Sequence, residues 1–226
     1  IGQPLTLPDA ATATHKLQCA SYTPFDKHQS PFDQPLVIHK ERMDADLALL
    51  AQRFECIRTY SVTGLEALPE LARKHGLKLI LGAWVSSNPL DTQIEIDGLI
   101  SANANPDVVS AVIVGNEALL RKEVTGAQLV KLIEAVKSQV RQPVTYADVW
   151  EFWHQYPEVA PAVDFLTIHL LPYWEDQPMG IDEALAHVGK IRQAFGEQYA
   201  PKGILIGETG WPSEGRQRET ALPSRI

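Results

Sequence analysis

The chain has 226 residues, of which 45% are hydrophobic and 21% are charged, and its formal net charge is -8. This composition is typical of a globular domain with one sizeable core. The negative charge argues against nucleic acid or an anionic membrane surface as a partner, because both prefer faces rich in Lys and Arg. No apolar run approaches the roughly 18–20 residues of a membrane-spanning helix.

The beginning of the chain has no usable periodicity. Residues 1–16 are expected to form an irregular arm, and they lack the features of a signal peptide. Residues 17–226 are expected to form a single catalytic domain. Because the first residue is Ile1 rather than Met, we expect the sequence to be a piece of a longer protein.

Short apolar runs predict seven buried strands. They lie at residues 17–22, 56–60, 78–84, 111–115, 143–147, 165–169 and 203–207. Apolar residues at three- and four-residue spacing predict helices at residues 40–54, 65–75, 91–101, 129–140 and 181–195. Gly76 is an expected helix C-cap, and Thr125 with Gln128 forms a predicted capping box. Strands that alternate with helices indicate a parallel sheet.

Two parallel-sheet architectures compete for this pattern. An open doubly wound sheet usually carries a glycine-rich phosphate loop after its first strand, but residues 21–25 contain no glycine. A barrel places functional residues at the ends of many strands, as this chain does. We therefore predict a (β/α)8 TIM barrel. A complete barrel needs about 250 residues and eight strands, so the expected barrel is truncated before its eighth strand.

Two carboxylates stand at the ends of predicted strands. Glu117 and Glu208 are the only Glu residues that directly follow apolar strand runs. A retaining glycosidase needs a nucleophile and a proton donor about 5–5.5 Å apart, and a closed barrel would bring these two side chains together. The alternative is two solvated surface acids. As the proton donor, Glu117 is expected to have a pKa raised by burial and by the second carboxylate.

Other polar and aromatic residues near strand ends are candidates for binding a sugar. They are Tyr22, Arg58, Tyr60, Trp84, Asn116, Asp148, His169, Tyr173, Trp174 and Trp211. Aromatic rings would stack on pyranose rings, and amides would bind hydroxyl groups. The structural alternatives are packed aromatics, a surface acid at Asp148 and a core histidine at His169. Arg58 shares a strand face with Tyr60, and inside a barrel Arg58 would need a carboxylate partner, for which Glu208 is a candidate.

The strand-end motifs resemble a known family. Val-Gly-Asn-Glu at residues 114–117 and Gly-Glu-Thr-Gly-Trp-Pro-Ser at residues 207–213 are similar to glycoside hydrolase family 17. Segments 21–25, 57–60 and 169–174 extend the likeness over residues 17–213. The resemblance implies a barrel enzyme that acts on β-1,3-glucans, with Glu117 as the acid/base and Glu208 as the nucleophile.

The likeness is closer to bacterial members than to plant endoglucanases. Several bacterial members are β-1,3-glucan glucanosyltransferases attached to inner-membrane glucan synthases, which implies a periplasmic or extracellular location. The predicted function is therefore a retaining glucanosyltransferase, in which a sugar hydroxyl replaces water as the acceptor. An endo-β-1,3-glucanase is the alternative enzyme, and a non-catalytic glucan-binding module is the alternative of another class, which the missing eighth strand makes credible.

The expected partner is a β-glucan oligosaccharide or polysaccharide, bound by a monomer without nucleic acid and without membrane insertion by this segment. No cofactor is expected. No metal is expected either, because the seven His residues show no paired ligand spacing. Cys19 and Cys56 lie in the first two predicted strands and are too few for a disulfide framework. We expect buried free thiols there, with one bridge between neighbouring strands as the alternative.

Overall fold

The computed structural model describes residues 16–26, 28–31, 33 and 36–224. Nearly all of the expected N-terminal arm lies outside this range, and Lys16, which lies within it, belongs to no helix or strand. The strands are β1 (Leu17–Ser21), β2 (Phe54–Arg58), β3 (Lys78–Ala83), β4 (Val109–Asn116), β5 (Val144–Val149), β6 (Leu166–Leu170) and β7 (Ile204–Thr209). The helices are α1 (Lys40–Leu50), α2 (Leu68–His75), α3 (Pro89–Ala102), α4 (Gly126–Lys137), α5 (Trp150–Gln155), α6 (Val159–Ala162) and α7 (Ile181–Gln198).

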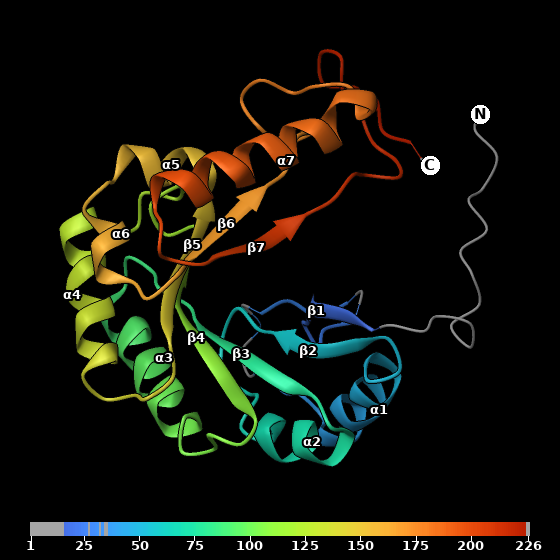
Figure 1. Cartoon of the computed structure of the whole chain (residues 1–226). Coiled ribbons are helices and arrows are strands. Elements are labelled where there is room, and N and C mark those ends of the chain that lie inside the picture. Colours follow the sequence, from blue (N-terminus) through green and yellow to red (C-terminus); the bar gives the residue numbers. More distant parts are fainter. Residues whose placement is uncertain (1–15, 27, 32, 34–35, 225–226) are drawn as a thin grey trace.

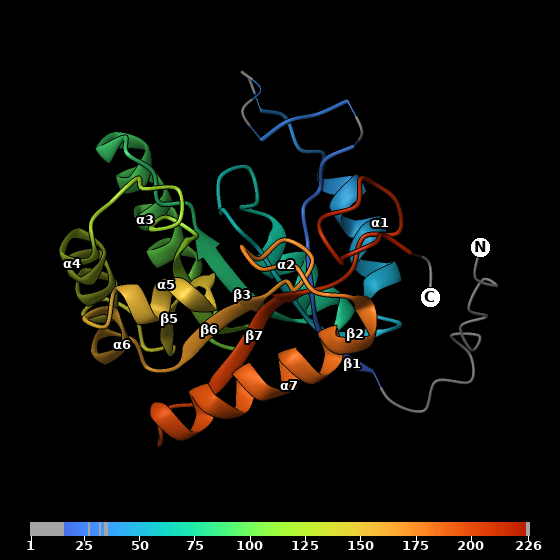
Figure 2. The same cartoon turned by 90° about the horizontal axis from the view of Figure 1, so that it is seen from above.

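The seven strands form one sheet in sequence order, and each neighbouring pair is parallel. The sheet curves into a nearly closed barrel with the helices outside it (Figure 1, and from above in Figure 2). Strands β1 and β7 are its two edges, and no eighth strand pairs with them among the described residues. The predicted barrel without an eighth strand is confirmed.

Helix ends follow local chemistry in most places. Gly76 caps α2 with a left-handed φ of 71°, and the capping box of Thr125 and Gln128 opens α4. The predicted end of the first helix at residue 54 was wrong, because Phe54 begins β2 after a short turn. Short helices α5 and α6 were not predicted, since six and four residues give no readable period.

The main core lies between the sheet and the surrounding helices. A smaller apolar cluster fills part of the barrel interior and includes Cys56, Ile80 and Ile113. Beside it is a cavity of about 380 Å³, lined by residues of both edge strands and by Arg58. The interior is therefore less filled on the side where β1 and β7 do not meet. None of the described helices has the length and apolar character needed to cross a bilayer.

Cys19 and Cys56 form a disulfide, so the expectation of free thiols was wrong. The reason is the register of β1 and β2, in which the two residues are direct partners with Cα atoms 4.4 Å apart. Paired residues of neighbouring strands point to the same side of the sheet. The residue spacing alone did not reveal this pairing.

Candidate active site

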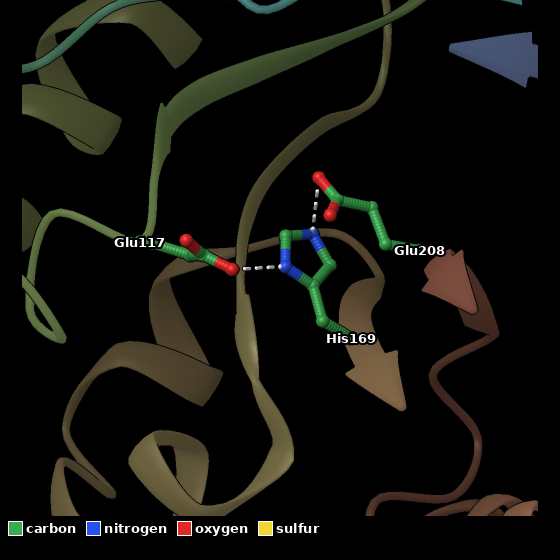
Figure 3. Close-up of side chains that lie close together, drawn as sticks. All are labelled: Glu117, His169 and Glu208. Atoms are coloured by element: carbon green, nitrogen blue, oxygen red, sulfur yellow. Dashed lines mark hydrogen bonds and ion pairs between the residues drawn. The ribbon is translucent and has the colours of Figure 1, made fainter. Parts of the chain in front are cut away.

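Three side chains meet at the carboxyl ends of the strands (Figure 3). Glu117 directly follows β4, His169 belongs to β6 and Glu208 belongs to β7. One oxygen of each carboxylate and one imidazole nitrogen lie within 4.8 Å of one another. This separation matches the short carboxyl–carboxyl distance of retaining glycosidases, about 5–5.5 Å. The sheet thus brings together the two acids that the sequence separates by 91 positions (208 minus 117).

The imidazole of His169 lies between the two acids and is fully buried. Its Nδ1 is 2.8 Å from Oε1 of Glu117, and its Nε2 is 3.7 Å from Oε1 of Glu208. Gly207 makes room for the ring, because a Cβ at that position would lie 3.0 Å from His169 and 2.6 Å from the methyl group of Thr167. His169 therefore contacts both candidate catalytic groups rather than packing as an isolated core residue.

Arg58 holds Glu208 in place. Its side chain is only 4% exposed, and its Nη1 donates to Oε1 of Glu208 at 2.9 Å. Its Nη2 donates to the amide oxygen of Asn116, and the guanidinium lies 4.0 Å from the ring centroid of Tyr60. The buried arginine thus has the carboxylate partner expected from the sequence. A fixed guanidinium also restricts the orientation of the carboxylate.

Among the described residues, the two acids and His169 form the one group dense enough in ligand atoms to hold a metal ion. One of the carboxylates is already ion-paired with Arg58 at 2.9 Å. Two acids about 5 Å apart can break a glycosidic bond without a metal. The site therefore needs no ion for the chemistry that its geometry suggests.

The backbone at Glu117 is strained. Glu117 has a φ of 52°, which is uncommon for a residue with a side chain. Its N–H donates to the carbonyl of Ala147 at 2.8 Å, and the N–H of Leu119 donates to the Tyr146 hydroxyl at 2.9 Å. Strand β5 therefore fixes the short loop that carries Glu117. Residues in such conformations often cluster at functional sites.

The pKa of Glu117 is lowered, whereas the sequence led us to expect a raised one. The largest cause is the hydrogen bond with His169, and the charges of His169, Arg121 and Arg58 act in the same direction. Burial opposes them by raising the pKa. The expectation was wrong because the nearest neighbour of Glu117 is an imidazole rather than the Glu208 carboxylate.

Asp148 lies beneath the Glu117 loop instead of facing the cleft. It is fully buried, accepts a hydrogen bond from the Tyr146 hydroxyl and accepts another from the N–H of Val149 at 2.8 Å. Burial raises the pKa of Asp148 to about 6. The structure places this residue as a support for the loop, where it has no open path to a sugar.

The raised pKa of Asp148 makes a testable contribution to stability. Below the ordinary pKa of 3.8 the folded and unfolded chains both carry the proton. Between pH 3.8 and about 6 only the unfolded chain loses it, so the stability of the parent falls as the pH rises through this window. Between pH 4 and 7 we expect the free energy of unfolding to rise in Asp148→Asn relative to the parent by about 2 kcal/mol. Urea unfolding of both proteins at these pH values measures this, and a difference that does not change with pH would contradict it.

A cavity of about 680 Å³ opens beside Glu117, His169 and Glu208, at the carboxyl ends of β1 to β3. Tyr22, Tyr60 and Trp84 all line it, so three of the predicted sugar-binding aromatics share one surface. Tyr60 connects this cavity to Glu208 through Arg58, which contacts both residues. Burial raises the pKa of Tyr60, and the charge of Glu208 also acts to raise it. The binding roles of these residues stay predictions.

Two residues that shape this cavity were missed in the sequence. Glu95 is 7% exposed and accepts hydrogen bonds from the N–H of Val62 at 3.1 Å and from the N–H of Trp84 at 3.0 Å. The Arg121 guanidinium lies 4.1 Å from the ring centroid of Trp84. Glu95 could have been found in the sequence from its position in α3, where it shares the buried face of the helix with Ile96.

The remaining predicted aromatics form a second group near β7. Tyr173 is buried and donates its hydroxyl to the carbonyl of Arg216, and its ring centroid lies 4.9 Å from that of Trp174 and 5.6 Å from that of Trp211. Trp174 is 47% exposed. None of the three lines the 680 Å³ cavity. Trp174 therefore offers the most open ring of this group.

Residues 19–226 match the family model of the BtgE/BtgC glycoside hydrolase domain. The chain belongs to this family. A probable β-glucosidase, btgE, of Aspergillus flavus is 32% identical over 194 residues, which cover 81% of this chain and 32% of that protein. A glucan 1,3-β-glucosidase of Schizosaccharomyces pombe is 30% identical over 193 residues, which cover 76% of this chain and 59% of that protein. The chain thus spans about a third to three fifths of these relatives.

The fold of this glycoside hydrolase domain matches a solved structure. The family 17 β-1,3-glucanosyltransferase of Rhizomucor miehei superposes with a TM-score of 0.76 and 26% identity, over 91% of this chain and 76% of that one. An active-site mutant of the same enzyme, solved with laminaritriose, gives a TM-score of 0.77. The resemblance to glycoside hydrolase family 17 is confirmed. These relatives are fungal, so the closer likeness to bacterial members stays a prediction.

Proposed function

We propose that this domain is a retaining β-1,3-glucan glucanosyltransferase. The observation that carries the proposal is the meeting of Glu117 and Glu208 with oxygens within 4.8 Å, which is close to the roughly 5–5.5 Å of retaining enzymes and below the roughly 6.5–9.5 Å that inverting enzymes need for a water beside the general base. The match to a β-1,3-glucanosyltransferase and the laminaritriose bound by its mutant support a β-1,3-glucan as the substrate.

In the first step, an oxygen of Glu208 attacks the anomeric carbon, and the glycosidic bond breaks. The leaving oxygen takes a proton from Glu117. In the second step, an acceptor hydroxyl gives its proton to Glu117 and attacks the same carbon, which breaks the ester bond to Glu208. Arg58 orients the attacking carboxylate through its 2.9 Å contact. Two inversions give a product with retained configuration.

The 680 Å³ cavity and the exposed ring of Trp174 lie on different elements around the two acids. This arrangement can hold sugar on both sides of the bond that breaks, which favours transfer to a second sugar. The relatives named as glucosidases support hydrolysis as the second candidate. The short distance between the acids favours either enzyme over a non-catalytic binding module.

Product analysis separates these functions. With laminaripentaose as the only sugar, transfer produces oligosaccharides longer than the donor, whereas hydrolysis produces only shorter ones. Proton NMR should show that the anomeric centre at which the donor is cleaved is still β in the first products, as a new glycosidic bond after transfer or as a new reducing end after hydrolysis. An α configuration at that centre would contradict the retaining mechanism, and binding without any products would favour the module.

We further propose that the domain works outside the reducing cytoplasm, in the periplasm or the extracellular space. The disulfide between Cys19 and Cys56 supports this location, because such bonds persist mainly in oxidising compartments. The expected monomeric state stays a prediction.

A further inference from the structure

His169 has no role in the two-acid mechanism, yet its ring lies between the two acids (Figure 3). It is fully buried on β6, and its Nδ1 lies 2.8 Å from Oε1 of Glu117. Its Nε2 has no hydrogen-bond partner among the described residues, and the nearest carboxylate oxygen, on Glu208, is 3.7 Å away. A buried ring with a carboxylate at each nitrogen is well placed to hold a proton.

The lowered pKa of Glu117 raises a difficulty for the proposed mechanism. An acid catalyst must carry its proton at the working pH, but the hydrogen bond with His169 favours the ionised form of Glu117. The proton that leaves the carboxyl group has one near destination, which is Nδ1 of His169 at 2.8 Å. A proton that leaves Glu117 can therefore be taken up by this nitrogen.

We propose that His169 is a positioning residue that holds the catalytic proton jointly with Glu117, beside the anionic Glu208. This proposal rests on the function proposed above. In one form, protonated Glu117 donates to a neutral imidazole through Nδ1. In the other, the imidazolium donates from Nδ1 to ionised Glu117. Both forms contain the same number of protons and direct the Nε2–H group toward Glu208.

Charged and titratable groups around the pair lie on β2, β5 and β7 and in the segment after β4. Glu208 on β7 favours a positive ring, and the Asp148 side chain on β5 is close enough for its titration to sense the charge of Glu117. The charges of Arg58 on β2 and Arg121 after β4 favour the ionised form of Glu117. Arg58 also pairs directly with Glu208, which limits how strongly that carboxylate attracts the ring.

The protonation of Glu117 and His169 changes during the reaction. When the leaving oxygen takes the proton from Glu117, the carboxylate faces a bare Nδ1 at 2.8 Å, and this repulsion favours recapture of a proton. Glu208 is at that moment an uncharged ester. The acceptor hydroxyl then supplies its proton to Glu117, and hydrolysis or transfer of the ester restores the Glu208 carboxylate. Each cycle returns the pair to its starting proton count.

The variant His169→Gln tests the proposal, because a glutamine amide can donate to Glu117 but cannot take up the proton. The donors are laminaritriose, whose leaving group needs a proton, and 2,4-dinitrophenyl β-laminaribioside, whose leaving group does not. We expect kcat/KM to fall about 100-fold or more with laminaritriose and less than about 10-fold with the activated donor. The alkaline limb of the pH profile with laminaritriose should move to lower pH, because Glu117 must then hold the proton alone.

His75→Gln is the matched control, because His75 also contacts a carboxylate, Asp44 at 2.6 Å, but lies at the end of α2 on the outside of the barrel. It should leave both rates and the pH profile unchanged. Equal losses of His169→Gln with both donors, at an unchanged pH profile, would mean a merely structural role and overturn the proposal. No turnover of either donor by the parent protein would instead refute the proposed function.

A measurement on the parent protein covers the case in which His169→Gln does not fold. Nitrogen-15 NMR of labelled histidine should show that the His169 ring loses a proton over the same pH range in which kcat/KM with laminaritriose falls. A ring that keeps one neutral tautomer throughout that range would overturn the proposal.

Discussion

Glu208→Gln is expected to reduce turnover of laminari-oligosaccharides by about 10⁴-fold or more, because the amide cannot form the covalent glycosyl intermediate. Binding should persist, since the 680 Å³ cavity and its aromatic residues do not include Glu208. Rates from product chromatography and affinity from calorimetry measure the two effects separately. Retained turnover would refute the assignment of Glu208 as the nucleophile.

A matched control for this variant is Glu134→Gln, the same change at an exposed position on α4. It should leave turnover unchanged. Glu208→Gln also removes the charged partner of Arg58, whose side chain is only 4% exposed. Leaving a buried charge unpaired is destabilising, so thermal unfolding of the variant must be measured to show that the lost activity does not come from an unfolded protein.

Glu117→Ala is expected to lower kcat/KM with laminaritriose by about 10²–10⁴-fold, because the leaving oxygen then departs without a proton. With 2,4-dinitrophenyl β-laminaribioside the covalent intermediate should still form, but its breakdown should be slow because no base activates the acceptor. Added azide needs no base, so it should restore turnover and give a β-glycosyl azide, identified by NMR and mass spectrometry.

Chloride at the same ionic strength is the control for azide, and it should restore nothing. An α-glycosyl azide, or rescue of Glu208→Gln instead of Glu117→Ala, would mean that the two roles are exchanged or that the mechanism is not retaining. Because Glu117 has a left-handed φ of 52°, alanine at this position keeps some backbone strain. The parent and variant should therefore be compared by unfolding in urea as well.

The two acids of the candidate site could be predicted from the sequence because each follows an apolar run directly. A buried parallel strand is recognisable in the sequence as a short continuous run of apolar residues. The carboxyl end of such a strand is where barrel enzymes place their functional groups. The same reasoning placed Arg58 in the barrel and named Glu208 as its partner, which the 2.9 Å ion pair bears out. These inferences needed only the period of the strand and the order of the elements.

The environment of each acid could not be predicted in this way. Whether His169 reaches Glu117, and whether Asp148 faces the cleft or the underside of a loop, depends on distances between β4, β5 and β6 that no single segment contains. For this reason a raised pKa of Glu117 was wrongly expected. For the same reason Cys19 and Cys56 were wrongly expected to be free thiols, because they are partners only in the register of β1 with β2.

By itself, the sequence determined the barrel, the two strand-end acids and the family resemblance, because apolar periodicity and short motifs are local properties of the chain. Only the tertiary structure decided that His169 lies between Glu117 and Glu208, that Gly207 makes room for it, and that the pKa of Glu117 is lowered. The physical reason is that hydrogen bonds and charges act over a few ångströms in space. Which groups come that close is set by how neighbouring strands pair, and not by their distance along the chain.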